Sequence, residues 1–224
     1  MKAYEEETKT VLPPKTYTLI RLDGRSFHSY LRGAEKPFDL AFSWHMWKTA
    51  EFLCSEISGA VFAYTQSDEI SILLQDFAEP GTQPWFGGQV QKIVSVSAAL
   101  AAAKLNSLRP AGLATFDSRV FTLPSSVEAA NYFVWRQKDA TRNSVSMAAQ
   151  AVFSHKELQG VNMAQVQEML FSQSGINWNN FPTQDKRGRC CVKNEIGGWR
   201  LDIEIPVFTQ DREYLRRMLP TRED

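Results

Sequence analysis

The chain has 224 residues, of which 43% are hydrophobic and 22% are charged, a composition typical of globular proteins. Its length suits one large domain or two small ones around a sizeable core. The formal net charge is zero, which excludes nucleic-acid binding through bulk positive charge and leaves a local basic patch or a brief encounter. No apolar run reaches the roughly 18 residues of a membrane span. The polar start "MKAYEEETKT" resembles no signal or transit peptide, so we expect a cytoplasmic protein with no membrane partner.

The cysteines and histidines argue against a disulfide framework and against a zinc site. The cysteines are Cys54, Cys190 and Cys191, an odd number without CxxC spacing. We interpret the adjacent pair in "RCCVK" as two thiols of a strand, with a redox element as the alternative. The three histidines of the chain are too few to favour a multi-histidine metal site.

Hydrophobic periodicity predicts the elements of the first half of the chain. Apolar side chains on both faces of the first strand indicate a central strand, which ends at the turn dipeptide Asp23-Gly24. The second and third strands form a hairpin around residues 66–69. The expected strands are 16–24, 60–65, 70–74 and 115–123. The expected helices are 37–58, where apolar residues recur every three or four positions, and 89–105, which is rich in small residues.

The second half is predicted to be mainly helical. Ser125 and Glu128 match a capping box that opens a helix, and Asn162 caps a later one. The expected helices are 125–138, 143–153 and 163–172. A loop and a β-hairpin that turns near residues 197–198 follow. This order of elements predicts an α+β fold in which helices pack mainly on one face of a sheet, and not a doubly wound parallel sheet.

Two adjacent acids, Asp68 and Glu69, lie at the tight turn of the predicted hairpin. If the first strand is central, Asp23 lies close to them, because neighbouring strands are ~4.8 Å apart. Clustered carboxylates repel one another unless a cation lies between them, and Mg²⁺ is the usual one. Two such ions can activate an attacking hydroxyl and stabilise a leaving pyrophosphate. The alternative is a pair of exposed turn acids unrelated to Asp23.

Four segments carry a resemblance to a known family. They are "RLDGRSFHSYLRG…KPFD", "YTQSDEISILL", "FDSRVFTLPS" and "NYFVWRQKDATRN". In this order, over roughly positions 17 to 195, they resemble the tRNA(His) guanylyltransferase family. Its members are 3′–5′ nucleotidyltransferases that add nucleotides to the 5′ end of RNA, with a catalytic domain like the palm of ordinary polymerases. The resemblance implies a polymerase-palm-like antiparallel sheet in a catalytic region over residues 1–138, and a helical and hairpin extension over residues 139–224 that forms one compact unit with it.

The resemblance also implies site residues and ligands. Asp23 and Asp68 would bind two Mg²⁺ ions with the Gly24 carbonyl, and Glu69 would complete a catalytic triad of acids. The implied nucleotide-binding residues are Gly24, Arg25, Ser26, Phe27, His28, Lys36, Ser67, Asp68 and Lys92. The alternatives are solvated surface charges for Lys36 and Lys92 and a packing or hydrogen-bonding role for His28. GTP and ATP would be the substrates or activators, and the family tends to form homotetramers.

Two departures from the family pattern refine the expected function. Thr141 stands where the tRNA(His)-specific enzymes have a histidine, and residues 87–89 lack the basic run that precedes Lys92 in the family. Both features resemble the bacterial and archaeal guanylyltransferase-like branch, whose members rebuild 5′-truncated tRNA by template-dependent 3′–5′ addition. We therefore expect tRNA repair. The alternatives are addition of one guanosine to tRNA(His), a palm-type nucleotide cyclase, and a non-catalytic nucleotide- or RNA-binding module.

Basic residues predict where RNA would bind. The candidates are Arg136, Arg142, Lys186, Arg187 and Arg189. Such charges contact phosphates and set affinity more than sequence specificity. Nearby aromatic side chains, among them Trp135 and Trp178, can stack a terminal base. The alternatives are solvated charges for the basic residues and a place in the core for Trp135.

Overall fold

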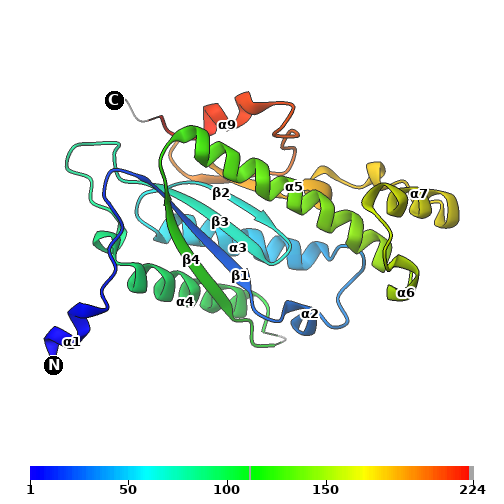
Figure 1. Cartoon of the computed structure of the whole chain (residues 1–224), viewed down its shortest axis with the longest axis horizontal. Coiled ribbons are helices and arrows are strands. Elements are labelled where there is room, and N and C mark those ends of the chain that lie inside the picture. The colour runs from blue at the N-terminus through cyan, green and yellow to red at the C-terminus, as the bar shows by residue number, and fades with distance from the viewer. Residues whose placement is uncertain (111, 222–224) are drawn as a thin grey trace.

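Within residues 1–110 and 112–221, which the computed structural model describes, six strands form one antiparallel sheet in the order β4-β1-β3-β2-β5-β6 (Figure 1). The strands are β1 (Tyr17–Gly24), β2 (Ala60–Gln66), β3 (Glu69–Gln75), β4 (Phe116–Leu123), β5 (Arg189–Lys193) and β6 (Trp199–Asp202). The α+β fold class is confirmed, and β1 lies inside the sheet as predicted. Residue 111 of the expected catalytic region (1–138) and residues 222–224 of the expected extension (139–224) lie outside the described residues.

Helices cover both faces of this sheet, so the covering is more even than the sequence predicts (Figure 1). They are α1 (Lys2–Glu7), α2 (Phe27–Tyr30), α3 (Leu40–Glu56), α4 (Val90–Leu108), α5 (Ser126–Gln150), α6 (His155–Leu158), α7 (Met163–Ser174), α8 (Thr183–Arg187) and α9 (Arg212–Met218), with short 3₁₀ turns at η1 (Trp85–Gly88) and η2 (Trp178–Asn180). Along the strands, Ile20 and Ile72 face α3 and α4, and Leu19 and Phe62 face α5 and α9. Strands that are apolar on both sides need cover on both sides. In the described part of the chain, no helix combines the length and the hydropathy that crossing a membrane requires.

Helix α5 is continuous, whereas the sequence predicts two helices with a break after residue 138. Its N-terminal cap is as predicted, because Ser125 Oγ accepts a hydrogen bond from the Glu128 amide at 3.2 Å. No glycine or proline stands between residues 138 and 143, and Thr141 donates its hydroxyl to the carbonyl one turn earlier, so the helix continues. The division expected at residue 138 therefore falls inside this helix.

A third apolar cluster fixes the far end of α5, beyond the sheet (Figure 1). Its buried members are Val145, Ala148 and Ala149 of α5 and Val166 and Leu170 of α7. Helix α7 is capped at Asn162, as predicted, and ends at Ser174, two residues beyond the expected end, where Gly175 adopts the left-handed conformation. Because α5 has 25 residues and is ~37 Å long, it connects the sheet to this cluster and can form one wall of a site between them.

Candidate active site

Three acidic residues converge at one end of the central strands, as the sequence predicts. In the antiparallel register, Asp23 of β1 lies opposite Glu69 of β3, and the Gly24 amide donates a hydrogen bond to the Asp68 carbonyl at 3.1 Å. On its other side Asp23 is paired with Asp117 of β4. Asp117 was not predicted from the sequence, because only the order and register of the strands make it a neighbour of Asp23.

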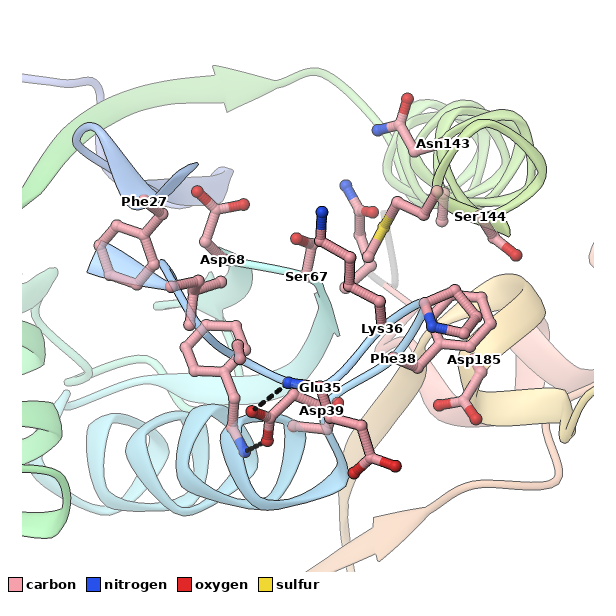
Figure 2. Close-up of a pocket in the computed structure, with 18 of the residues that line it drawn as sticks. Phe27, Glu35, Lys36, Phe38, Asp39, Ser67, Asp68, Asn143, Ser144 and Asp185 are labelled. Atoms are coloured by element: carbon pink, nitrogen blue, oxygen red, sulfur yellow. Dashed lines mark hydrogen bonds between the residues drawn. The ribbon is translucent and has the colours of Figure 1, made fainter. Parts of the chain in front are cut away.

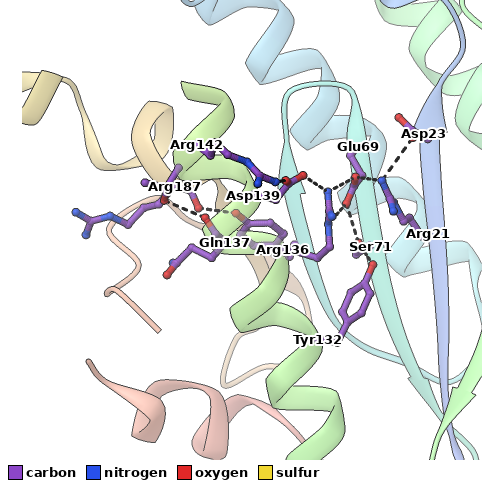
Figure 3. Close-up of polar contacts among 12 residues, drawn as sticks. Arg21, Asp23, Glu69, Ser71, Tyr132, Arg136, Gln137, Asp139, Arg142 and Arg187 are labelled. Carbon is purple, nitrogen blue, oxygen red and sulfur yellow. Dashed lines mark hydrogen bonds and ion pairs between the residues drawn. The ribbon is translucent and has the colours of Figure 1, made fainter. Parts of the chain in front are cut away.

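Glu69 is bound by two arginines (Figure 3). Arg136 donates hydrogen bonds from Nε and Nη2 to the two carboxylate oxygens, both at 2.6 Å, and Arg21 Nη2 lies 2.7 Å from Oε2. Burial raises the pKa of the Glu69 carboxyl, and the charges of Arg136 and Arg21 oppose this shift. Since guanidinium groups occupy both oxygens, Glu69 holds arginines in place and does not complete a metal-binding triad.

Asp23 and Asp68 are the acids best suited to bind a metal. The Asp23 side chain is 33% exposed, and its carboxylate lies 3.5 Å from Arg21 Nη2. Burial raises the pKa of Asp68, and the charge of Asp23 adds to this shift, while hydrogen bonds from its own amide and from Ser67 oppose it. Carboxylates with incomplete charge compensation are ligands for a hard cation such as Mg²⁺, which uses one or two of them and completes its shell with water and phosphate oxygens. Among the described residues, no cluster of three or more His, Cys, Asp or Glu side chains is arranged to hold a metal, so Asp23 and Asp68 stay the candidate carboxylate ligands, together with the Gly24 carbonyl.

A cavity of about 420 Å³ lies beside Asp68 (Figure 2). Its walls are the segment from α2 to the start of α3, the turn between β2 and β3, the second half of α5, and residues around α8. In Figure 2, Lys36, Ser67 and Asp68 lie on one side of the cavity, and Asn143 and Ser144 of α5 lie on the other. Ligand sites usually measure roughly 300–1,000 Å³, so the cavity has the size for a nucleotide.

Two tight turns give the cavity its shape. A Cβ atom at Gly24 would collide with the ring of Phe27, so only glycine lets this buried ring pack against the end of β1. Ser26 and Ser67 have φ angles of 58° and 48°, in the left-handed region that few residues other than glycine adopt. The Arg25 amide donates to the Thr115 carbonyl at 2.9 Å, which ties the turn after β1 to the strand beside it.

The structure brings most of the predicted nucleotide-binding residues together. Those that line the cavity are Phe27, His28, Lys36, Ser67 and Asp68. Gly24, Arg25 and Ser26 form the turn from β1 to α2, next to the acids but outside the described cavity walls. His28 Nε2 lies 3.0 Å from the Ser29 hydroxyl, a local hydrogen bond that fixes its ring at the edge of the cavity.

Lys92 lies at the opposite end of the sheet from the acids. It belongs to the first turn of α4, which a hydrogen bond of 2.9 Å from the Leu12 amide to the Gly88 carbonyl holds beside the chain that enters β1. The other end of α4 is near the site, because Tyr30 donates its hydroxyl to the Arg109 carbonyl at 3.4 Å. A 19-residue helix is ~28 Å long. Lys92 therefore does not line the cavity beside Asp68, and its role in phosphate binding stays a prediction.

The predicted RNA-binding residues are partly buried. Arg136 is 2% exposed and is bound to Glu69, and Arg189 is 6% exposed and lies 3.8 Å from Asp185. Neither can contact RNA, so these two predictions are wrong: a buried carboxylate needs a guanidinium partner, and each pairing draws the basic side chain inward. The side chain of Arg142 is 63% exposed, and Lys186 and Arg187 are half-buried, so these three stay candidates.

Two other groups near the acids were not predicted from the sequence. Asn143 and Ser144 line the cavity because α5 continues past residue 138. Arg21 bridges the carboxylates of Asp23 and Glu69, but its strand position alone indicates no partner. An uninterrupted run without glycine or proline is the signal that identifies the long helix, whereas only the strand register reveals the bridge.

Known proteins share this fold and much of this sequence. The family model described as tRNAHis guanylyltransferase matches residues 1–124. A bacterial tRNA(His) guanylyltransferase-like protein solved in complex with ATP is 45% identical, with 97% of this chain and 96% of that chain covered and a TM-score of 0.93. A bacterial structure of the same description in complex with GTP is 41% identical, with the same 97% and 96% coverage and a TM-score of 0.86. The tRNA(His) guanylyltransferase of Schizosaccharomyces pombe is 29% identical over 88% of this chain and 80% of its own length.

Proposed function

The chain belongs to the tRNA(His) guanylyltransferase family, and on that premise we propose that it adds nucleotides in the 3′–5′ direction to the 5′ end of tRNA, with the opposite strand as template. It is a nucleotidyltransferase. Repair of 5′-truncated tRNA is favoured over addition of one guanosine to tRNA(His), because the bacterial guanylyltransferase-like proteins are 45% and 41% identical and the yeast guanylyltransferase is 29% identical. The presence of Thr141 in place of the histidine of the tRNA(His)-specific enzymes supports the same choice.

We assign the nucleoside triphosphate to the cavity beside Asp68. The observation that carries this assignment is that Asp68 is both part of the cavity wall and a neighbour of Asp23. The two bacterial relatives are described in complex with ATP and with GTP, which supports both nucleotides as ligands. Lys36 would balance phosphate charge, and Ser67 would contact the nucleotide from the turn.

The proposed reaction is a nucleotidyl transfer without a covalent protein intermediate. The 3′-oxygen of the bound nucleotide forms a bond to the phosphorus at the RNA 5′ end, the bond from that phosphorus to pyrophosphate (or to AMP at an adenylated end) breaks, and the hydroxyl proton passes to solvent. Asp23 and Asp68 would hold Mg²⁺, expected as two ions, whose charge lowers the repulsion between the phosphates. The turn of Gly24, Arg25 and Ser26 lies next to these carboxylates. Because the Gly24 and Arg25 amides already donate to Asp68 and Thr115, the exposed Arg25 side chain would contact the phosphates there.

Replacement of the two aspartates tests the proposal. Asp23→Asn and Asp68→Asn each remove a metal-binding charge while keeping the side-chain shape, so we expect nucleotide addition to fall by at least about 100-fold. The assay is extension of a 5′-truncated tRNA with Mg²⁺ and each nucleoside triphosphate in turn, with the added base compared with the template base. Glu56→Gln, an exposed carboxylate at the end of α3, is the matched control and should keep full activity. Full activity in Asp23→Asn would overturn the assignment.

Two further measurements distinguish this function from its alternatives. A cyclic product from GTP and Mg²⁺ without RNA would indicate a palm-type cyclase. Tight RNA binding without any turnover would indicate a non-catalytic binding module. The homotetramer and the cytoplasmic location stay predictions, which size-exclusion chromatography with light scattering and cell fractionation test.

A further inference from the structure

Trp135 is a half-exposed aromatic ring above the two arginines that bind Glu69, of which Arg136 is buried and Arg21 is partly exposed. It is 52% exposed, although its helix α5 packs against the sheet. The Cζ atoms of Arg136 and Arg21 lie 4.5 and 6.0 Å from its ring centroid. Because Glu69 holds both guanidinium groups (Figure 3), they form a fixed support for the indole. Such a support keeps the ring in place without covering it.

A surface arginine, Arg119, and a surface acid, Asp117, stand on the edge strand β4, beside the strand that carries Arg21. Arg119 is opposite Arg21 and Asp117 is opposite Asp23 in the strand register. Their side chains are 60% and 54% exposed, and they lie 3.6 Å apart in a weak pair. Side chains alternate between the two faces along β1 and β4. Asp117, Arg119 and Phe121 therefore share one face, which is the α5 side of the sheet, because the ring centroids of Phe121 and Tyr132 of α5 lie 5.8 Å apart. The exposed guanidinium of Arg119 is therefore on the same side of the sheet as Trp135.

The acids thus separate two surfaces. The cavity walls, as far as the structure describes them, include Asp68 but not Asp23, Trp135 or Arg119. The nucleoside triphosphate occupies the cavity in the proposed reaction, so the second reactant has to reach the acids from outside it. The surface of Trp135 and Arg119 adjoins Asp23 through Arg21, which contacts both Trp135 and Asp23.

We propose that the surface of Trp135 and Arg119 binds the 5′-terminal nucleotide of the RNA, with its base stacked on Trp135 and its phosphate at Arg119. This inference rests on the proposed function. Stacking of a base on an aromatic ring tolerates any sequence, because every base has a π face. That tolerance suits an enzyme whose RNA end changes with each nucleotide added. A stacked end at Trp135 places the 5′ phosphate on the Asp23 side of the acids, facing the nucleotide on the Asp68 side.

Substitutions of Trp135 test this surface. The probe is an RNA hairpin with a recessed 5′-triphosphate end and a fluorescent label in its loop. For Trp135→Ala we expect the Kd for the hairpin, by fluorescence anisotropy, to rise by about 5- to 150-fold. The KM for RNA should rise in parallel, and the KM for GTP should stay within about twofold. Trp135→Phe should restore much of the binding, because a phenyl ring also stacks. Arg119→Gln should weaken binding of the hairpin with the 5′-triphosphate but not of the same hairpin with a 5′-hydroxyl.

The controls separate the possible failures. Trp44→Ala removes a tryptophan of α3 that is 47% exposed, and it should change neither RNA binding nor KM. Thermal unfolding of each variant identifies a loss of folding. The inference is overturned if a folded Trp135→Ala variant has an unchanged Kd and KM for RNA, or a higher KM for GTP instead. Extension of the hairpin by the wild type would in that case still support the proposed function. If the wild type binds the hairpin but never extends it, the proposed function fails, and the Kd of Trp135→Ala still decides whether this surface binds the RNA end.

Discussion

Asp68 illustrates how a functional residue can lower the stability of the fold. Burial and the charge of Asp23 raise its pKa, so the folded chain binds a proton at Asp68 more tightly than the unfolded chain does. An acid with a raised pKa lowers the free energy of unfolding at pH values above that pKa, and this penalty disappears as the pH falls towards the ordinary pKa of an aspartate, about 4. The carboxylate is therefore kept at a cost that a bound cation offsets.

Asp68→Asn should therefore stabilise the metal-free protein. The amide carries no charge, so Tm at pH 7 should rise by on the order of 2 °C, and the gain should shrink at pH 4. Mg²⁺ should raise the Tm of the wild type and not that of the variant, since a ligand stabilises only the fold that binds it. Differential scanning fluorimetry measures the Tm of the wild type and of the variant at both pH values, with and without Mg²⁺. A variant with a lower Tm than the wild type at pH 7 would show that Asp68 contributes a favourable contact.

At the scale of residues, types and neighbours in the chain predict part of the site. The turn motifs identify Asp23 and Asp68, because acids that follow apolar strands are visible in the sequence. The roles of Glu69 and Arg136 could not be predicted in this way, since 67 positions separate them and only the packing of α5 against β3 joins them. From sequence alone a charged residue is expected to be exposed. This expectation fails where the residue is buried together with a partner of opposite charge.

At the scale of elements, the entry into β5 carries a strict requirement for glycine. Gly188 has φ +77°, and a Cβ atom there would lie 2.6 Å from the Tyr64 hydroxyl oxygen and 2.7 Å from the Thr65 carbonyl oxygen. The Tyr64 hydroxyl also donates to the Arg187 carbonyl at 2.6 Å. This junction therefore fixes the turn from α8 into the sheet, at the wall of the cavity that Gly188 lines.

A matched pair of glycine substitutions tests this requirement. Gly160 has the same φ of +77°, but a Cβ atom there would meet nothing within 4 Å, so Gly160→Ala should lower the free energy of unfolding only by the backbone term of about 1–2 kcal/mol. Gly188→Ala should cost about 1–3 kcal/mol more, because the methyl group collides with backbone as well. Urea unfolding of both variants gives the comparison. Equal losses in the two variants would mean that the junction shifts to accept the methyl group.

The elements themselves were largely predictable. The hairpin strands, the cap at Ser125 and the cap at Asn162 follow from local chemistry, which is why they match. The single helix α5 was missed because Asp139, Thr141 and Asn143 are weak helix formers. Tertiary packing overrides that preference: Ala140, Ser144 and Val145 are buried along the stretch.

At the scale of the whole molecule, the cavity is held between two apolar clusters. The sheet side belongs to the core of α3, and the opposite wall belongs to the part of α5 that α7 supports. Trp178 adds to that support, since its Nε1 donates to Ser144 Oγ at 2.8 Å. The sequence could not predict this arrangement, because the pairing of α7 with the end of α5 depends on contacts between helices that the sequence analysis places in separate elements.

The third cluster should therefore control nucleotide binding without touching the nucleotide. Leu170 is fully buried there and packs with Val145 and Ala148 of α5, so Leu170→Ala should lower the free energy of unfolding by about 2–5 kcal/mol and loosen the α5 wall. Leu215→Ala in α9 removes an equally buried leucine from the α5 face of the sheet, away from the cavity. We expect a comparable loss of stability in both variants but a several-fold higher Kd for a fluorescent GTP analogue only in Leu170→Ala. Equal Kd values in the two variants would mean that α5 keeps its position at the cavity without the Leu170 contacts to α7. The packing of α5 on the sheet would then be sufficient to hold this wall.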